Sequence, residues 1–166
     1  SAWKGKQVKL NFGAVDWKAD VFVNDILIGS HQGGFTPFSF DITPYLSGKG
    51  EQKLVVRVWD PTEKGYQPIG KQTSRPEGIW YTSVTGIWQT VWIEPVAVNH
   101  VTAVKAIPDI DKEVVDVTVS AAKCCVADYA EVALFDGVKQ VSVAKGVTGK
   151  ALRLAVKSPE LWSPES

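Results

Sequence analysis

The sequence predicts an all-β protein, and two patterns carry this prediction. Apolar and polar side chains alternate in six short runs, which is typical of half-buried strands. Residues that favour turns separate the runs, among them Asn24-Asp25 and the Ser-Gly-Lys-Gly segment 47–50.

Each run has the length of a strand. In the first run Val8, Leu10 and Phe12 share one face, and the same spacing recurs in the others, over residues 19–23, 38–42, 54–58, 115–119 and 152–156. Asn24-Asp25 lies between two apolar runs and predicts a tight hairpin. Residues 121–134 are alanine-rich and also fit a helical face. We expect a strand there, because alternation through Ala130, Val132 and Leu134 fits as well and the neighbours are strands.

Composition excludes several classes of protein. The 166 residues are 45% hydrophobic and 22% charged, which is typical of a folded chain rather than a disordered one. Eighteen basic and 18 acidic side chains give zero net charge, so no basic surface for nucleic acid is expected. No apolar run approaches the about 20 residues of a membrane span. The sequence has no methionine and begins with serine, so we expect a processed product or a piece of a longer protein.

The two cysteines, Cys124 and Cys125, are adjacent and cannot join distant parts of the chain. We expect two small strand residues, one facing inward and one outward. Together with the distant His31 and His100 they do not have the spacing of a zinc site. No metal and no cofactor are therefore expected.

A domain boundary is expected near residues 95–100. Six of the 7 tryptophans precede Pro95, whereas the chain beyond His100 is rich in Val, Ala and Lys. This change in composition predicts two β domains, residues 1–98 and 99–166. We expect four tryptophans of the first domain, which lie on strand patterns, to pack in its interior: Trp17, Trp59, Trp88 and Trp92.

The segment 60–85 is a long connection between strands, and such loops in compact domains are often functional. It carries Arg75, Glu77, Trp80 and Tyr81. Flat rings can stack on the apolar C–H faces of sugars, while charged side chains pair with the hydroxyls. The loop is therefore a candidate carbohydrate site. The alternative is that Trp80 and Tyr81 only anchor the loop on the sandwich.

Three stretches resemble the non-catalytic N-terminal modules of glycoside hydrolase family 2, the β-galactosidase group. Residues 8–46, with HQGGFTPFSFDIT from His31, resemble the family's jelly-roll sugar-binding domain. Residues 78–96, GIWYTSVTGIWQTVWIEPV, resemble the segment that ends this domain. Residues 161–165, LWSPE, resemble a motif near the end of the following immunoglobulin-like domain. Within this pattern we expect a structural role for His31, and we expect Asp41 to accept backbone hydrogen bonds.

The resemblance implies a role without catalysis in this chain. Retaining glycosidases need two carboxylates about 5 Å apart, and in this family both glutamates lie in a (β/α)8 barrel that follows the immunoglobulin-like domain. We therefore expect no catalytic residue here. Both domains are expected to be truncated. The resemblance implies further strands before residues 3–6 of the first domain and after LWSPE in the second, and an immunoglobulin-type sandwich needs about 100 residues.

The leading hypothesis is a scaffold for the barrel of an enzyme that hydrolyses terminal β-linked sugars, most closely β-galactosides. The loop 60–85 would line the rim of its active site through Arg75, Glu77, Trp80 and Tyr81. The alternatives are a free-standing carbohydrate-binding module and a purely structural domain pair that builds an assembly. The implied partners are the glycan, the enzyme's own barrel and further copies of the chain. Family habit suggests a periplasmic or secreted bacterial protein.

Overall fold

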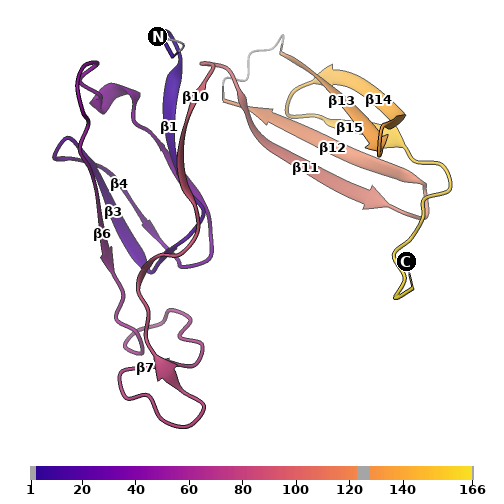
Figure 1. Ribbon diagram of the computed structural model, residues 1–166. Coiled ribbons are helices and arrows are strands. Elements are labelled where there is room, and N and C mark those ends of the chain that lie inside the picture. Colours follow the sequence, from indigo (N-terminus) through magenta and orange to yellow (C-terminus); the bar gives the residue numbers. More distant parts are fainter. Residues whose placement is uncertain (1–2, 123–127, 166) are drawn as a thin grey trace. The chain divides into compact units, whose positions relative to one another are not determined.

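The computed structural model describes residues 3–122 and 128–165 and divides into two compact units, residues 1–97 and 98–166. Both are built from β-strands, with one short 3-10 helix among the described residues, so the predicted all-β class is confirmed. Figure 1 shows the strands of each unit. In the described part of the chain, no helix has the length and apolarity needed to cross a membrane.

The described residues of the first unit form two three-stranded sheets and two short strand pairs. One sheet has the order β10-β1-β5 and the other β4-β3-β6, and all of their neighbouring strands are antiparallel. The elements are β1 (Gln7–Phe12), β2 (Val15–Asp16), β3 (Lys18–Val23), β4 (Ile26–Gln32), β5 (Phe38–Asp41), η1 (Thr43–Tyr45), β6 (Leu54–Trp59), β7 (Gln72–Thr73), β8 (Tyr81–Thr82), β9 (Gly86–Ile87) and β10 (Val91–Val96).

The core of the first unit lies between its two sheets and follows the predicted alternation. Leu10 and Phe12 of β1 and Val21 of β3 are completely or almost completely buried. They belong to one apolar cluster, which places the inward faces of β1 and β3 against each other. Side chains of this kind gain about 1.5–3 kcal/mol each when they leave water. Burial of alternate positions therefore fixes which face of each strand is inside.

The turn at Asn24-Asp25 is the predicted hairpin. Val23 pairs with Ile26, and both turn residues have positive φ, 49° and 66°, as a two-residue hairpin turn with right-handed strand twist requires. The Asn24 amide also donates to the Tyr45 carbonyl at 2.9 Å. The hairpin is thus tied to η1 as well as to its own strands.

Two motif residues have the expected structural roles. The His31 ring stacks on Phe38 with 4.2 Å between centroids, and its Nε2 lies 3.0 Å from Thr36 Oγ1. The Asp41 carboxylate accepts a hydrogen bond from the Thr43 backbone N–H at 2.9 Å and begins the turn into η1. The His31 contacts thus hold the connection between β4 and β5 in place, and the Asp41 contact holds the turn after β5.

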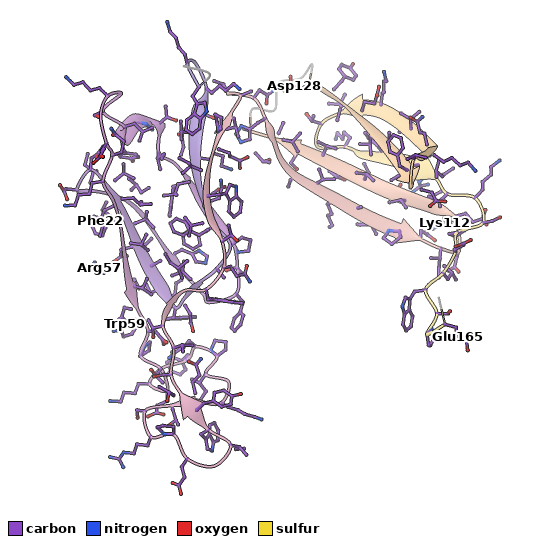
Figure 2. The ribbon with its side chains drawn as sticks, in the orientation of Figure 1. Phe22, Arg57, Trp59, Lys112, Asp128 and Glu165 are labelled. Atoms are coloured by element: carbon purple, nitrogen blue, oxygen red, sulfur yellow. The ribbon has the colours of Figure 1, made fainter. Side chains whose placement is uncertain are left out.

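The prediction that the strand tryptophans are packed is wrong for three of them. Trp59 is 58% exposed, Trp88 53% and Trp92 43%. Val58 and Val91 pack on the core, so the adjacent Trp59 and Trp92 face outward by alternation. Figure 2 labels Trp59 and Arg57, which lie two residues apart on β6. The rings are therefore available at the surface of the unit.

The second unit has a sheet of order β11-β12-β15 and a pair β13-β14. Its core consists of Val117, Val119, Leu152 and Leu154, against which Ala130, Val132 and Leu134 pack. The strand interpretation of 121–134 is thus confirmed for β13, while Cys124 and Cys125 lie outside the described residues. The strands are β11 (Val101–Asp109), β12 (Val114–Ala121), β13 (Tyr129–Asp136), β14 (Lys139–Val147) and β15 (Ala151–Ala155).

Candidate functional site

A hollow of about 360 Å³ lies in the first unit beside the base of the long loop. Its lining combines one carboxylate, two aromatic rings and two polar side chains with apolar and backbone surface. The lining residues are Asp16, Phe35, Gln72, Val84, Thr85, Gly86, Ile87 and Trp88. A concave surface with a few polar groups on an apolar background is typical of small-molecule sites.

Pairing of two short strands builds one wall of the hollow. Asp16 of β2 lies opposite Gly86 of β9, and Val15 lies opposite Ile87. Gly86 has φ +124°, a conformation that L side chains rarely adopt, so glycine allows the chain to bend here before β10. The Trp88 backbone N–H then donates to the Ala14 carbonyl at 3.3 Å. This wall carries Asp16 and Trp88 on adjoining segments.

Two aromatic rings meet at one side of the hollow. The Trp88 indole N–H donates to the Gly34 carbonyl at 2.7 Å, which fixes the ring against the turn after β4. The Phe35 ring meets it edge to face, with 5.9 Å between centroids and 73° between planes. Phe35 remains 68% exposed and Trp88 53% exposed. Both rings therefore offer apolar surface to a bound molecule.

The Asp16 carboxylate is held in a partly buried position. Burial raises its pKa above the usual value, and the nearby Asp60 carboxylate raises it further. Gly34 lies directly against it, because a Cβ built on Gly34 would stand only 2.7 Å from Asp16 Oδ1. Because residue 34 has no side chain, the Asp16 carboxylate can occupy the space beside it.

Hydrogen bonds organise the base of the long loop. The Gln72 side-chain oxygen accepts from the Val84 N–H at 2.6 Å, and so joins two lining residues from the middle and the end of the loop. Glu63 accepts from the Thr73 hydroxyl at 2.6 Å, the Ser74 N–H at 3.0 Å and the Ser74 hydroxyl. These bonds lower the pKa of Glu63 to about 2. The loop is therefore held closed by several polar contacts near the hollow.

The four residues predicted to form a rim lie further out in the same loop. Arg75, Glu77, Trp80 and Tyr81 are all exposed, and none of them lines this hollow. Within the described chain, neither the Arg75 guanidinium nor the Glu77 carboxylate has a hydrogen bond or ion pair. The backbone N–H of Trp80 donates to the backbone carbonyl of Glu77 at 3.1 Å and so closes a turn. Tyr81 lies in β8 beside Gln72, which connects this group to the hollow through one strand pair.

Sequence reasoning did not single out Asp16, Phe35 or Trp88 as site residues. The signal was present, because all three lie in or beside the stretches that carry the family resemblance. Phe35 follows the Gly33-Gly34 pair, and Trp88 closes the second Gly-Ile-Trp triplet. Asp16 lies between Val15 and Trp17, where alternation indicates only a polar position on a strand.

The chemistry of this hollow fits a sugar better than a metal ion. A carboxylate can accept hydrogen bonds from hydroxyls, and the exposed rings can cover C–H surface. Among residues 3–122 and 128–165, no cluster of three or more His, Cys, Asp or Glu side chains is arranged to hold a metal. The arrangement can therefore bind and orient a glycan.

Comparison with known proteins also indicates a sugar-binding domain. Residues 1–96 match the protein family described as "Glycosyl hydrolases family 2, sugar binding domain". A β-galactosidase of Thermoanaerobacter pseudethanolicus is 34% identical over 108 residues, which cover 64% of this chain and 14% of that protein. A β-glucuronidase of Formosa agariphila is 31% identical over 99 residues, which cover 60% of this chain and 10% of that protein.

Solved structures agree on the fold. A β-glucuronidase from Bacteroides uniformis superposes with a TM-score of 0.72 at 24% identity, over 99% of this chain and 21% of that one. The chain thus spans only a small part of the length of the relatives that it matches. What it covers is their sugar-binding region. The chain belongs to glycosyl hydrolases family 2 and contains the sugar binding domain of that family.

Proposed function

We propose that the chain is a non-catalytic, sugar-contacting region of a family 2 glycosidase that hydrolyses terminal β-linked sugars, most closely β-galactosides. The observation that carries the proposal is the position of the Asp16 carboxylate and the exposed Phe35 and Trp88 rings in the lining of one hollow. Relatives named β-galactosidase and β-glucuronidase support the substrate class. The catalytic groups would come from the enzyme's own (β/α)8 barrel.

The hollow can recognise a pyranose by two complementary contacts. The rings of Phe35 and Trp88 cover an apolar C–H face, a contact worth about 0.5–1.5 kcal/mol beyond area burial. Asp16 accepts hydrogen bonds from hydroxyls on the polar edge, and a hydrogen bond to a charged group contributes about 1.5–3 kcal/mol. The Gln72 oxygen already accepts from Val84, so its amide N–H groups remain as donors toward the sugar.

The outer loop would extend this site. Arg75 and Glu77 supply polar contacts, while Trp80, 46% exposed, and Tyr81, 58% exposed, supply stacking surface. Exposed apolar side chains in the same region also favour contact with another protein surface, since Ile79 is 67% exposed and Val84 69%. We propose the barrel as that surface. We propose that the same loop surface also contacts further copies of the chain.

Saturation-transfer NMR with methyl β-D-galactopyranoside tests the proposal on the 166-residue chain. Transfer concentrated on the C–H protons of one sugar face, with a Kd in the millimolar range, is the expected result for a rim that supplies only part of a site. Asp16→Ala should weaken binding, whereas Asp25→Ala, in the β3–β4 turn, should leave it unchanged. A much tighter Kd would favour a free-standing module, and no transfer at all would favour a purely structural domain pair.

A further inference from the structure

Asp60 holds the two ends of the long loop together beside the hollow. Its Oδ1 accepts from the Thr62 backbone N–H at 2.8 Å, and its Oδ2 accepts from the Thr85 hydroxyl at 2.9 Å. Thr85 lines the hollow, whereas Asp60 directly follows β6. Both carboxylate oxygens are thus engaged, which fixes the position of the carboxylate.

The hollow therefore lies in the field of two carboxylates from different strands. Asp16 comes from β2 and Asp60 directly follows β6, and the Asp60 carboxylate adds to the effect of burial in raising the pKa of Asp16. None of the described lining residues is basic. On β6, Arg57 is engaged elsewhere, because its Nη2 donates to Asp20 Oδ2 at 2.5 Å and its guanidinium lies over the Phe22 ring.

We propose that Asp16 and Asp60 make this hollow select neutral sugars over uronates, with Asp60 as a specificity-determining residue that does not itself contact the sugar. The inference rests on the proposed sugar-binding function of the hollow. A uronate differs from the corresponding neutral hexose by a carboxylate at C6, which is negatively charged near neutral pH. Within the hollow no cation lies among the described lining residues, so there that charge meets the like charges of Asp16 and Asp60.

Coulomb's law gives the size of the effect. A like charge about 6 Å away, at an effective dielectric constant of about 40, lowers a binding constant about tenfold. Two such charges act on a uronate in the hollow, so discrimination of at least about tenfold is expected at low ionic strength. The relatives of this chain include both β-galactosidases and β-glucuronidases, so the two sugar classes are the relevant comparison.

The experiment is a chemical-shift titration of the full 166-residue chain with methyl β-D-galactopyranoside and, separately, methyl β-D-glucopyranosiduronate. The unaltered chain should bind the neutral sugar at least about tenfold more tightly. Asp60→Asn keeps a side-chain oxygen for the Thr62 N–H and an amide for the Thr85 hydroxyl, so it removes mainly the charge. It should reduce the discrimination severalfold by strengthening uronate binding, with little change for the galactoside.

Asp25→Asn is the matched control, because it removes one carboxylate charge in the β3–β4 turn and should leave both affinities unchanged. Equal affinity of the unaltered chain for the two sugars would overturn the inference while leaving the proposed function intact. The same conclusion would follow if Asp60→Asn left the ratio unchanged in a chain with an unaltered melting temperature. Binding of neither sugar would instead contradict the proposed function. Loss of galactoside binding in a folded Asp60→Asn chain would assign Asp60 to positioning and overturn its role in selectivity.

Discussion

Gly34→Ala perturbs the candidate site at a single, defined contact. The new Cβ would stand 2.7 Å from Asp16 Oδ1 and 3.2 Å from Asp16 Cγ, whereas ordinary contact begins at 3.4 Å. The Asp16 carboxylate must therefore withdraw by about 0.7 Å or rotate away from residue 34. No positive φ is involved at Gly34, so the backbone itself accepts alanine.

The expected loss is in binding rather than in folding. A displacement of this size exceeds the about 0.5 Å within which binding groups need to be held. Losing a hydrogen bond to a charged acceptor costs about 1.5–3 kcal/mol, which is about a 10- to 100-fold increase in Kd for the galactoside. The clash is with the end of a short side chain, so the free energy of unfolding should change by less than about 1 kcal/mol.

A sugar titration and a thermal melt on the same sample provide the assay. Gly146→Ala is the control, because its Cβ would stand 2.5 Å from Leu152 Cδ2 in the second unit. It should lower the melting temperature of that unit and leave the sugar affinity unchanged. A Gly34→Ala chain that binds galactoside with its original Kd would refute the reasoning, and so would a loss of binding that merely follows unfolding of the first unit.

Three further changes test other parts of the structure. Trp88→Phe removes the indole donor to the Gly34 carbonyl, so it should cost about 0.5–1.5 kcal/mol in stability and raise the Kd for galactoside severalfold; a titration and a melt that match the unaltered chain would contradict this. The lowered pKa of Glu63, about 2 against an ordinary 4.5, means that its support of the loop is fully present above pH 4.5 and lost as the pH falls through about 2. The Ser74 amide signal, followed by NMR, should keep its position until the pH approaches 2, and a midpoint near 4.5 would disprove the contact. Leu154→Ala empties a fully buried position and should destabilise the second unit by about 2–5 kcal/mol while the first unit melts unchanged; hydrogen exchange that rises equally in both units would argue against independent cores.

The six strands that alternation predicted could be recognised because each depends on local information. Leu10, Val21 and Val117 share a period of two with their neighbours, and burial of one face follows from that period alone. The turn at Asn24-Asp25 was equally local, since these residue types accept the positive φ that a tight hairpin needs. These elements could therefore be predicted without knowledge of contacts between distant parts of the sequence.

The site was harder to predict because it depends on pairing over long sequence distances. Asp16 meets Gly86 only through the β2–β9 pair, and the depth of its burial has no local signal. Alternation places Trp59 and Trp92 on a face but does not say whether anything covers that face, so the expectation of packing was wrong. Aromatic content drew attention to the tip of the loop, whereas the hollow lies at its base.

The central claim is that the hollow around Asp16 contacts sugar, and a ¹H–¹⁵N correlation map of the chain with methyl β-D-galactopyranoside tests it most directly. Binding should shift the Trp88 indole N–H and the backbone amides of Phe35 and Thr85, with a common millimolar Kd. Residues of the second unit should serve as an unshifted reference. Shifts confined to other surfaces, or a map that stays unchanged at saturating sugar, would contradict the claim.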